Sequence, residues 1–232
     1  MSVLQRRVVS TLLALGLFGI VLLAVKIGST QSVSNQKPDA VDPVVQAIRK
    51  GGLKEAARIK GHYEGTVQTT GWMKYDLEAL ASHSSTIVLG IPFSGSSDVV
   101  GGDSIETEYK VKVERVIKGK IKSGEFLDVA VPGGKVTFED GTTAEIKAED
   151  LGPIQENQRY IMFLGPIGPN PEVLRLTGGG QGLFEVDSDT RIKPRGHKTD
   201  IVQRHKDENL ADFVNKIEIE VKKHPDTLPC CK

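Results

Sequence analysis

The most pronounced hydrophobic pattern in the chain is an uncharged run at its beginning. Residues 8–25 are apolar or small apart from two hydroxyl side chains, and Arg6 and Arg7 precede them. A helix of this length rises roughly 27 Å, close to the roughly 30 Å of a bilayer's hydrocarbon core. The run exceeds the roughly 7–15 apolar residues of a secretory signal, and Lys26 stands where a cleavage site prefers small residues. We expect a retained signal anchor, with a cleaved signal as the alternative.

The basic residues before this run predict its orientation. Positive charge ahead of an apolar span favours an N-terminus inside the cell. We therefore expect residues 1–7 in the cytoplasm, residues 8–25 in the lipid bilayer and the rest of the chain outside the cell membrane. Residues 26–41 are polar and turn-rich, which is typical of a flexible linker. If the signal is cleaved, the same domain is secreted or periplasmic.

Residues 42–85 show helical spacing with interruptions. Asp42 and Pro43 suit an N-cap and a first helical position, and an apolar stripe follows them. Gly51 and Gly52 interrupt the stripe, so we expect two short helices there and a third over residues 73–84. These helices are expected to pack on a β-barrel.

From Thr86 the apolar spacing becomes that of strands. "TIVLGI" predicts a buried strand of about six residues, and the glycine- and serine-rich "PFSGSSDVVGGDS" predicts a loop. "TEYKVKVERVIKG" alternates until its phase slips, which predicts a β-bulge at Glu114 and Arg115. "EFLDVAVPGG" predicts another strand, and "RYIMFLG", apolar on both faces, predicts the most buried one.

The segment "KVTFEDGTTAEIK" predicts a hairpin that has two possible registers. A two-residue turn pairs Phe138 with Thr143 and divides the apolar residues between the faces. A three-residue loop with a left-handed Gly141 instead pairs Val136 with Ala144 and gathers the apolar residues on one face. We predict the second register.

The C-terminal part predicts two more strands and a helix. "EVLRLTGGGQGLFEV" is interpreted as strands around a glycine-rich connection, because a phosphate loop would lead into a helix. Apolar spacing predicts an amphipathic helix over residues 207–223. The fold class is therefore mainly β (α+β): a small OB-like Greek-key barrel over residues 86–205, flanked by short helices and followed by a helix and tail over 206–232.

The order "SSTIVLG", "YKVKVERVIKG", "EFLDVAVPGG", "RYIMFLG" resembles the netrin-like and metalloprotease-inhibitor barrels. It is similar also to exported bacterial proteins of unassigned function with that plan, and the likeness covers residues 76–190. The resemblance implies an OB-type barrel. It does not imply protease inhibition, because such inhibitors block zinc through an N-terminal cysteine, and no cysteine lies near the start of this barrel.

Composition narrows the possible partners. The chain has 30 Lys and Arg residues against 30 Asp and Glu, and 5% aromatic residues. No overall field attracts nucleic acid, so no nucleic-acid partner is expected. A basic edge consists of Lys110, Lys112, Lys118, Lys120 and Lys122. We interpret it as a solvated face, or as a face weakly attracted to anionic head groups, because glutamates interrupt it and aromatic residues are missing from it.

The sequence offers little catalytic chemistry. Its two cysteines, Cys230 and Cys231, are adjacent near the C-terminus. We interpret them as incidental thiols of a C-terminal tail and assign no metal site. A lipid or metal role is the alternative, and Cys230 and Cys231 with His224 are the metal-ligand candidates. No nucleophile elbow and no helical zinc-hydrolase motif is present, so no catalytic residue and no cofactor is assigned.

These patterns favour a membrane-anchored, extracytoplasmic, non-catalytic binding or scaffold module. Its partner is expected to be a protein or envelope component, contacted through the expected loops at residues 92–104 and 165–172. One alternative is an envelope hydrolase or metal-dependent enzyme. The other is an OB domain that binds an oligonucleotide or oligosaccharide.

Overall fold

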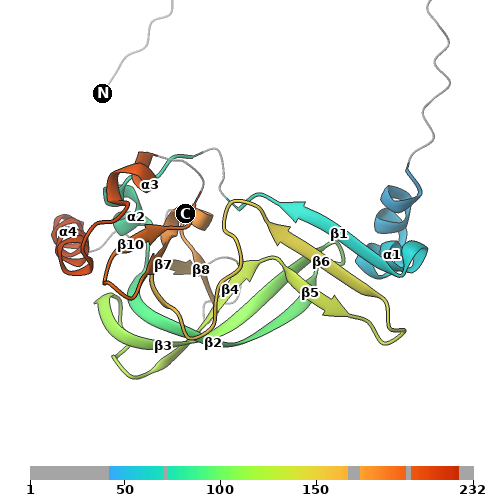
Figure 1. The fold of residues 1–232 in the computed structure, drawn as a ribbon, viewed down its shortest axis with the longest axis horizontal. Helices are drawn as coiled ribbons and strands as arrows, with labels where there is room; N and C mark the ends of the chain where they lie inside the picture. The colour runs from blue at the N-terminus through green and yellow to red at the C-terminus, as the bar shows by residue number, and fades with distance from the viewer. Residues whose placement is uncertain (1–41, 70–72, 167–172, 197–199, 225–232) are drawn as a thin grey trace, which may run out of the picture. The chain divides into compact units, whose positions relative to one another are not determined.

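The computed structural model describes residues 42–69, 73–166, 173–196 and 200–224. The expected membrane segment, residues 8–25, and the expected linker lie outside these ranges. Within these ranges, no helix combines the length and apolar character needed to cross a membrane. The described part is a mainly β, α+β structure (Figure 1).

The larger of two sheets has seven strands in the order β10-β9-β7-β2-β3-β4-β8. An additional pairing between β7 and β8 joins the first part of the sheet to its end, so that β2, β3, β4, β8 and β7 form a closed circuit of paired strands. We call these five strands the strand ring. Only β4 and β8 run parallel within it. The seven strands span Thr86–Val100 (β2), Ser104–Lys118 (β3), Phe126–Pro132 (β4), Arg159–Pro166 (β7), Val173–Leu176 (β8), Leu183–Val186 (β9) and Ile192–Pro194 (β10).

Strand β7 lies between β2 and β9, and its six central residues are all buried. This confirms the prediction that "RYIMFLG" is the most buried strand. One face of β7 contributes Tyr160 and Met162 to the interior of the ring, together with Val111 and Val129. Its other face contributes Phe163 to a second core under the helices.

The predicted bulge in β3 is confirmed. Leu89 is paired with Arg115 and Gly90 with Val113, which leaves Glu114 as an extra residue. Its carboxylate accepts a hydrogen bond from Arg159 Nε at 2.8 Å. The extra residue bends β3 and lets the strands curl into the ring.

The predicted loop at residues 92–104 is wrong. Strand β2 continues to Val100, and only residues 101–103 form the turn. Ser94 has a φ of 55° and resets the register, after which Gly95 pairs with Tyr109. A Cβ atom at Gly95 would lie 2.7 Å from Tyr109 Cε1. Because glycine has no Cβ atom, the phenol side chain of Tyr109 can lie against β2. The glycines and serines here serve close strand pairing, which the local sequence does not reveal.

The second sheet has three strands in the order β1-β6-β5. They span His62–Val67 (β1), Gly134–Thr137 (β5) and Thr143–Ala148 (β6). The predicted hairpin register is confirmed: Val136 pairs with Ala144, and Gly141 has a φ of 81°. Strand β1 lies where only helices were expected. It forms because β6 supplies a parallel partner, while its own residues are at most half-buried.

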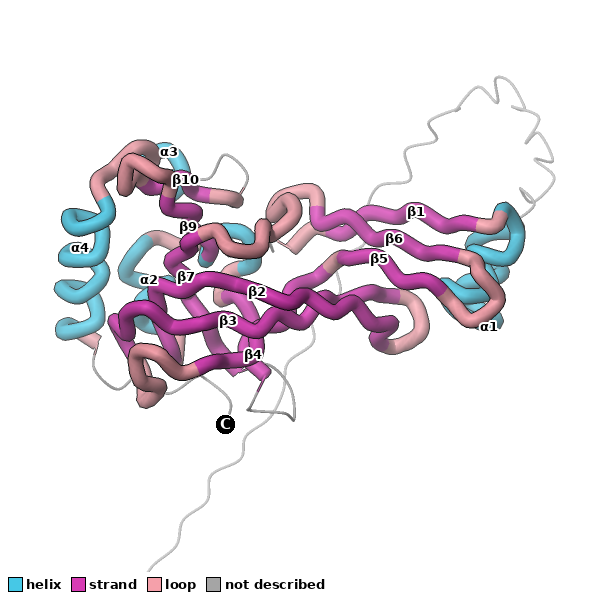
Figure 2. The backbone as a smooth tube through the Cα atoms, turned by 60° about the horizontal axis from the view of Figure 1, so that its bottom comes forward, coloured by secondary structure: helices cyan, strands magenta, loops and turns pink. Residues whose placement is uncertain are grey.

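Helix α1, Pro43–Lys60, is kinked where the sequence predicted a break between two helices. Gly52 is non-helical there, and Leu53 N donates a 2.8 Å hydrogen bond to Gly102 O in the β2–β3 turn. Leu53 joins Ile105, Ala144 and Ile146 in a small core. Helix α1 therefore packs on the turn of the β2–β3 hairpin and on the three-stranded sheet, and not on the strand ring (Figure 2). We call α1, β1, β5, β6 and residues 95–108 the hairpin lobe.

Three further helices cover the other face of β7. They are α2 (Leu77–His83), α3 (Asp200–His205) and α4 (Leu210–Lys223). A short 3-10 helix, η1, spans Gly179–Gly182. Phe213 and Ile217 of α4 pack with Phe163 and Phe184, as the predicted amphipathic helix requires. Strand β10 and helix α3 were not predicted. The segment expected as one barrel, residues 86–205, also contains β5 and β6, which belong to the separate sheet.

Candidate functional site

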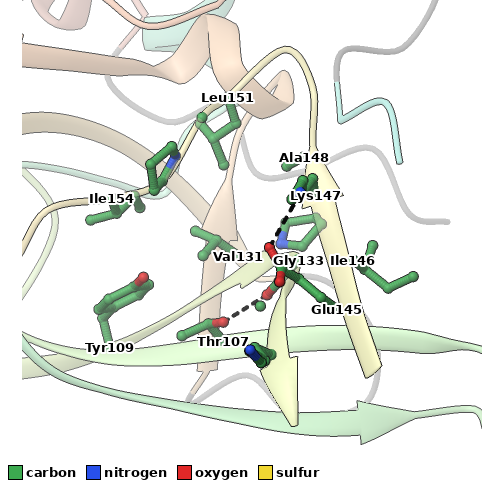
Figure 3. A pocket seen from close by; sticks show the side chains of 15 residues that line it. Thr107, Tyr109, Val131, Gly133, Glu145, Ile146, Lys147, Ala148, Leu151 and Ile154 are labelled. Atoms are coloured by element: carbon green, nitrogen blue, oxygen red, sulfur yellow. Dashed lines mark hydrogen bonds and ion pairs between the residues drawn. The ribbon is translucent and has the colours of Figure 1, made fainter. Parts of the chain in front are cut away.

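A cavity of about 460 Å³ lies where the strand ring meets the hairpin lobe (Figure 3). Strands β3 and β4 form one side and β6 another, while the segment 151–154 covers it. Most of its wall is apolar and is formed by Tyr109, Val131, Ile146, Ala148, Leu151 and Ile154. Glu145 and Lys147 supply charge at its β6 side.

The cavity exists because the chain turns sharply from β4 of the ring into β5 of the lobe. Gly133 and Gly134 make this turn with φ values of 96° and 139°, which other residues rarely adopt. Thr107 Oγ1 donates a 2.6 Å hydrogen bond to Gly133 O. A Cβ atom at Gly134 would lie 2.3 Å from Thr107 Oγ1, so the turn has no room for a side chain.

The segment over the cavity is fixed by hydrogen bonds to strands β6, β7 and β2. Gly152 N donates to Ala148 O at 3.0 Å, and Gln155 N donates to the Tyr160 hydroxyl at 3.1 Å. Farther along, Asn157 N donates to Pro92 O at 2.8 Å. These bonds hold Leu151 and Ile154 over the cavity, which is therefore formed before any ligand binds.

The charges at the cavity largely compensate one another. Lys147 Nζ lies 3.2 Å from a Glu64 carboxylate oxygen and 3.7 Å from one of Glu145. Lys135 is exposed at the edge of β5. The chemistry of the wall thus suits an apolar group, with polar contacts confined to the opening.

Tyr109 is the titratable aromatic residue in the wall. Burial raises the pKa of its hydroxyl above the ordinary value of 10.0, and the negative charge of Glu156 raises this pKa further. Glu156 is held nearby because its carboxylate accepts a 2.8 Å hydrogen bond from Gly95 N. Burial also raises the pKa of Tyr160.

These raised pKa values predict that the protein loses stability in alkali. The folded state favours the neutral phenols, so the unfolded chain releases the protons first as the pH rises above 10.0. We expect the free energy of unfolding to fall between about pH 8 and about pH 11, and to fall less in Tyr109→Phe. Chemical denaturation at the two pH values measures both slopes. Equal slopes in the two proteins would contradict the assignment to Tyr109.

Of the metal-ligand candidates, the structure describes only His224, since Cys230 and Cys231 lie outside the described residues. His224 Nε2 lies 3.0 Å from Glu78 Oε1, and ligand atoms of His224, Glu78 and Glu220 lie within 4.8 Å of one another. Lys223 Nζ contacts both Glu220 carboxylate oxygens, at 2.9 and 3.1 Å. Because this ammonium already compensates Glu220, we assign no metal to the cluster.

The basic edge predicted from the sequence includes aromatic side chains, contrary to expectation. Lys110 is paired with Asp128 at 2.5 Å, and Lys118 Nζ donates to Ala81 O at 2.7 Å. Two aromatic residues lie beside these strands: Phe93 pairs with Lys110 in the register, and Phe126 pairs with Lys112. Their rings meet edge to face at 5.3 Å. The statement that aromatic residues are missing from this face is therefore wrong.

Sequence reasoning placed binding at two loops and missed the cavity. Residues 92–104 are mainly paired strand, and of the second expected loop, 165–172, only Gly165 and Pro166 are described, within β7. The sequence signal that could have indicated the cavity is "VPGG", residues 131–134, where two glycines directly follow a predicted strand. No protein-family model and no curated protein matches this chain.

Proposed function

We propose that the chain is a membrane-anchored, extracytoplasmic, non-catalytic binding module that holds an apolar group of a protein or envelope component in the cavity beside Tyr109. The cavity carries this proposal. Its volume of about 460 Å³ falls within the roughly 300–1,000 Å³ of small-molecule sites. Its wall is mostly apolar, and its cover is fixed by hydrogen bonds, so a ligand gains apolar contact without reordering the protein.

The lining favours binding over catalysis. Among the residues that the structure describes, the lining of the cavity contains no histidine, cysteine or serine. A nucleophile and its base must lie within about 2.6–3.2 Å of each other, and the lining offers no such pair. Phosphate binding is disfavoured as well, because glutamates compensate Lys147, which leaves Lys135 as the one lysine of the described lining outside an ion pair. An envelope hydrolase and an oligonucleotide binder are therefore poorer explanations of this site.

We infer further that the strand ring is a Greek-key barrel of the OB type. Three consecutive antiparallel strands, β2, β3 and β4, are followed by β7, which returns beside β2 in the order β7-β2-β3-β4. This is the strand order of a Greek key, with β5 and β6 inserted in the long connection. The likeness to netrin-like barrels remains part of this proposal, supported by the order of the strands.

A photoreactive alkyl compound tests the binding site in the full chain. We expect an alkyl diazirine, applied to protein in lipid nanodiscs, to label Val131, Leu151 and Ile154, as peptide mass spectrometry would show. Ala148→Phe places an aromatic ring at the half-buried wall of the cavity and should reduce this labelling about tenfold, as expected for a loss of about 1.4 kcal/mol of binding.

Thr137→Phe is the matched control, because Thr137 is exposed on β5 and does not line the cavity. It adds the same ring and should leave labelling of the cavity unchanged. Labelling that avoids residues 131–154, or that Ala148→Phe does not reduce, would remove the cavity as the binding site.

A further inference from the structure

Helix α1 concentrates positive charge in a chain whose total charge is zero. Residues Pro43–Lys60 contain five basic side chains and one acidic side chain, Glu55, which gives a net charge of +4. The buried side of the helix consists of Ala47, Leu53, Ala56 and Ala57. All the charged side chains therefore lie outside that packed surface.

Two of the five basic residues are compensated by the β5–β6 turn. Arg58 Nε lies 2.8 Å from an Asp140 carboxylate oxygen, and Lys54 Nζ lies 4.0 Å from one of Glu139. The other three, Arg49, Lys50 and Lys60, are exposed. Within the described ranges none of these three forms an ion pair. The helix thus presents three uncompensated cations to its surroundings.

Exposed apolar side chains accompany these cations. Val45 is 39% exposed and Ile59 is 46% exposed, at the two ends of α1. Val100, 42% exposed, lies two residues before Gly102, the residue that α1 contacts. Helices that lie at a bilayer surface also combine lysine and arginine with apolar side chains. Because α1 buries its own apolar side with Ile105 and Ala144, its basic residues must supply most of the attraction.

Helix α1 follows the expected anchor closely in the sequence. It begins at Pro43, and the apolar run ends at Val25. A flexible chain of this length has an average span of roughly 20–25 Å. Attraction between exposed charges acts over about 8–10 Å at physiological salt, which is shorter than this average, so docking requires the tether to adopt spans below its average.

We propose that the exposed side of α1 docks on the anionic phospholipid head groups of the bilayer that anchors the chain. Arg49, Lys50 and Lys60 supply the attraction, and Val45 and Ile59 enter the boundary between head groups and acyl chains. This inference rests on the membrane anchor of the proposed function. At the kink, Leu53 N donates a hydrogen bond to Gly102 O in the β2–β3 turn. Docking of α1 therefore fixes the hairpin lobe at the membrane.

The test uses the full chain in nanodiscs, with Cys230→Ser and Cys231→Ser so that one introduced cysteine carries a nitroxide. Gln46→Cys reports on α1, and Asp212→Cys reports on an exposed position of α4. In discs that contain anionic phosphatidylglycerol we expect a lipid-bound nickel chelate to relax the label at residue 46 and not the one at residue 212. Discs of phosphatidylcholine alone should give no such relaxation at either position.

Charge removal separates electrostatic docking from mere proximity. The triple substitution Arg49→Gln, Lys50→Gln and Lys60→Gln should lower the ratio of docked to undocked protein about 100-fold, at about fivefold for each charge near an anionic surface. The control triple removes exposed lysines outside α1 and outside the basic edge, by Lys74→Gln, Lys206→Gln and Lys222→Gln, and should leave the ratio unchanged.

The outcomes distinguish the two proposals. If the protein remains in the discs but the label at residue 46 is not relaxed, or is relaxed equally without anionic lipid, the docking of α1 is wrong and the anchor stands. If the protein is recovered outside the discs and is released from membranes by alkaline carbonate, the anchor and the docking are both wrong.

Discussion

Replacement of Phe184 by alanine is expected to lower the free energy of unfolding by about 3–5 kcal/mol. Phe184 is fully buried on β9, where the ring centroid lies 5.7 Å from that of Phe163 on β7 and 4.8 Å from that of Phe213 on α4. The phenyl side chain of Phe184 therefore joins the seven-stranded sheet to the helices. Its loss leaves a cavity that neither the strands nor α4 can close without breaking other contacts.

Chemical denaturation followed by circular dichroism measures this effect. Phe126→Ala is the control, because Phe126 is 54% exposed on β4 and the substitution should cost less than about 1 kcal/mol. A loss below about 1 kcal/mol in Phe184→Ala would mean that α4 does not pack on the sheet as described.

Gly52→Ala should have the second largest effect, at about 2–4 kcal/mol. Gly52 has a φ of 72° and a ψ of −161°, a conformation that is essentially restricted to glycine. A Cβ atom there would lie 2.2 Å from Gly102 O, a backbone atom of the hairpin turn. The helix must then move away from the hairpin, and the hydrogen bond from Leu53 N to Gly102 O is lost.

Gly51→Ala is a matched control one residue away. A Cβ atom at Gly51 would lie 2.9 Å from Glu55 Cβ, so the helix must shift slightly, but the backbone of Gly51 is helical and no backbone atom of the β2–β3 turn lies within reach of the added Cβ. This substitution should therefore lower the free energy of unfolding by less than Gly52→Ala does. Hydrogen exchange should show faster exchange at Leu53 in Gly52→Ala alone. Equal behaviour of the two variants would contradict the described kink.

The sequence predicts the structure best where a pattern has one physical solution. In the β5–β6 hairpin, only the register that pairs Val136 with Ala144 gathers the apolar residues on one side, and that register is present. The phase slip in β3 likewise has one economical explanation, an extra residue, and Glu114 is that residue. Both inferences use side-chain alternation, which depends only on neighbouring residues.

The sequence predicts poorly where a segment takes its structure from a distant partner. Residues 62–67 have weak alternation and become β1 because β6 offers a parallel edge. Residues 95–100 contain glycine and serine and still form strand, because Tyr109 covers Gly95 across the pair. The metal candidate His224 lies beside Glu78, which is 146 residues away in the sequence, and no spacing rule connects the two.

The sequence by itself determined the apolar N-terminal run, the mainly β class, the bulge, the hairpin register and the amphipathic helix α4, because each follows from periodicity over a few residues. Tertiary structure alone decided the closed ring, the parallel strand β1, the contact of α1 with the hairpin tip and the cavity beside Tyr109. These features arise where separate segments meet, as Thr107, Val131, Ile146 and Leu151 do around the cavity. Their positions are set by the packing of whole strands, which no local pattern encodes.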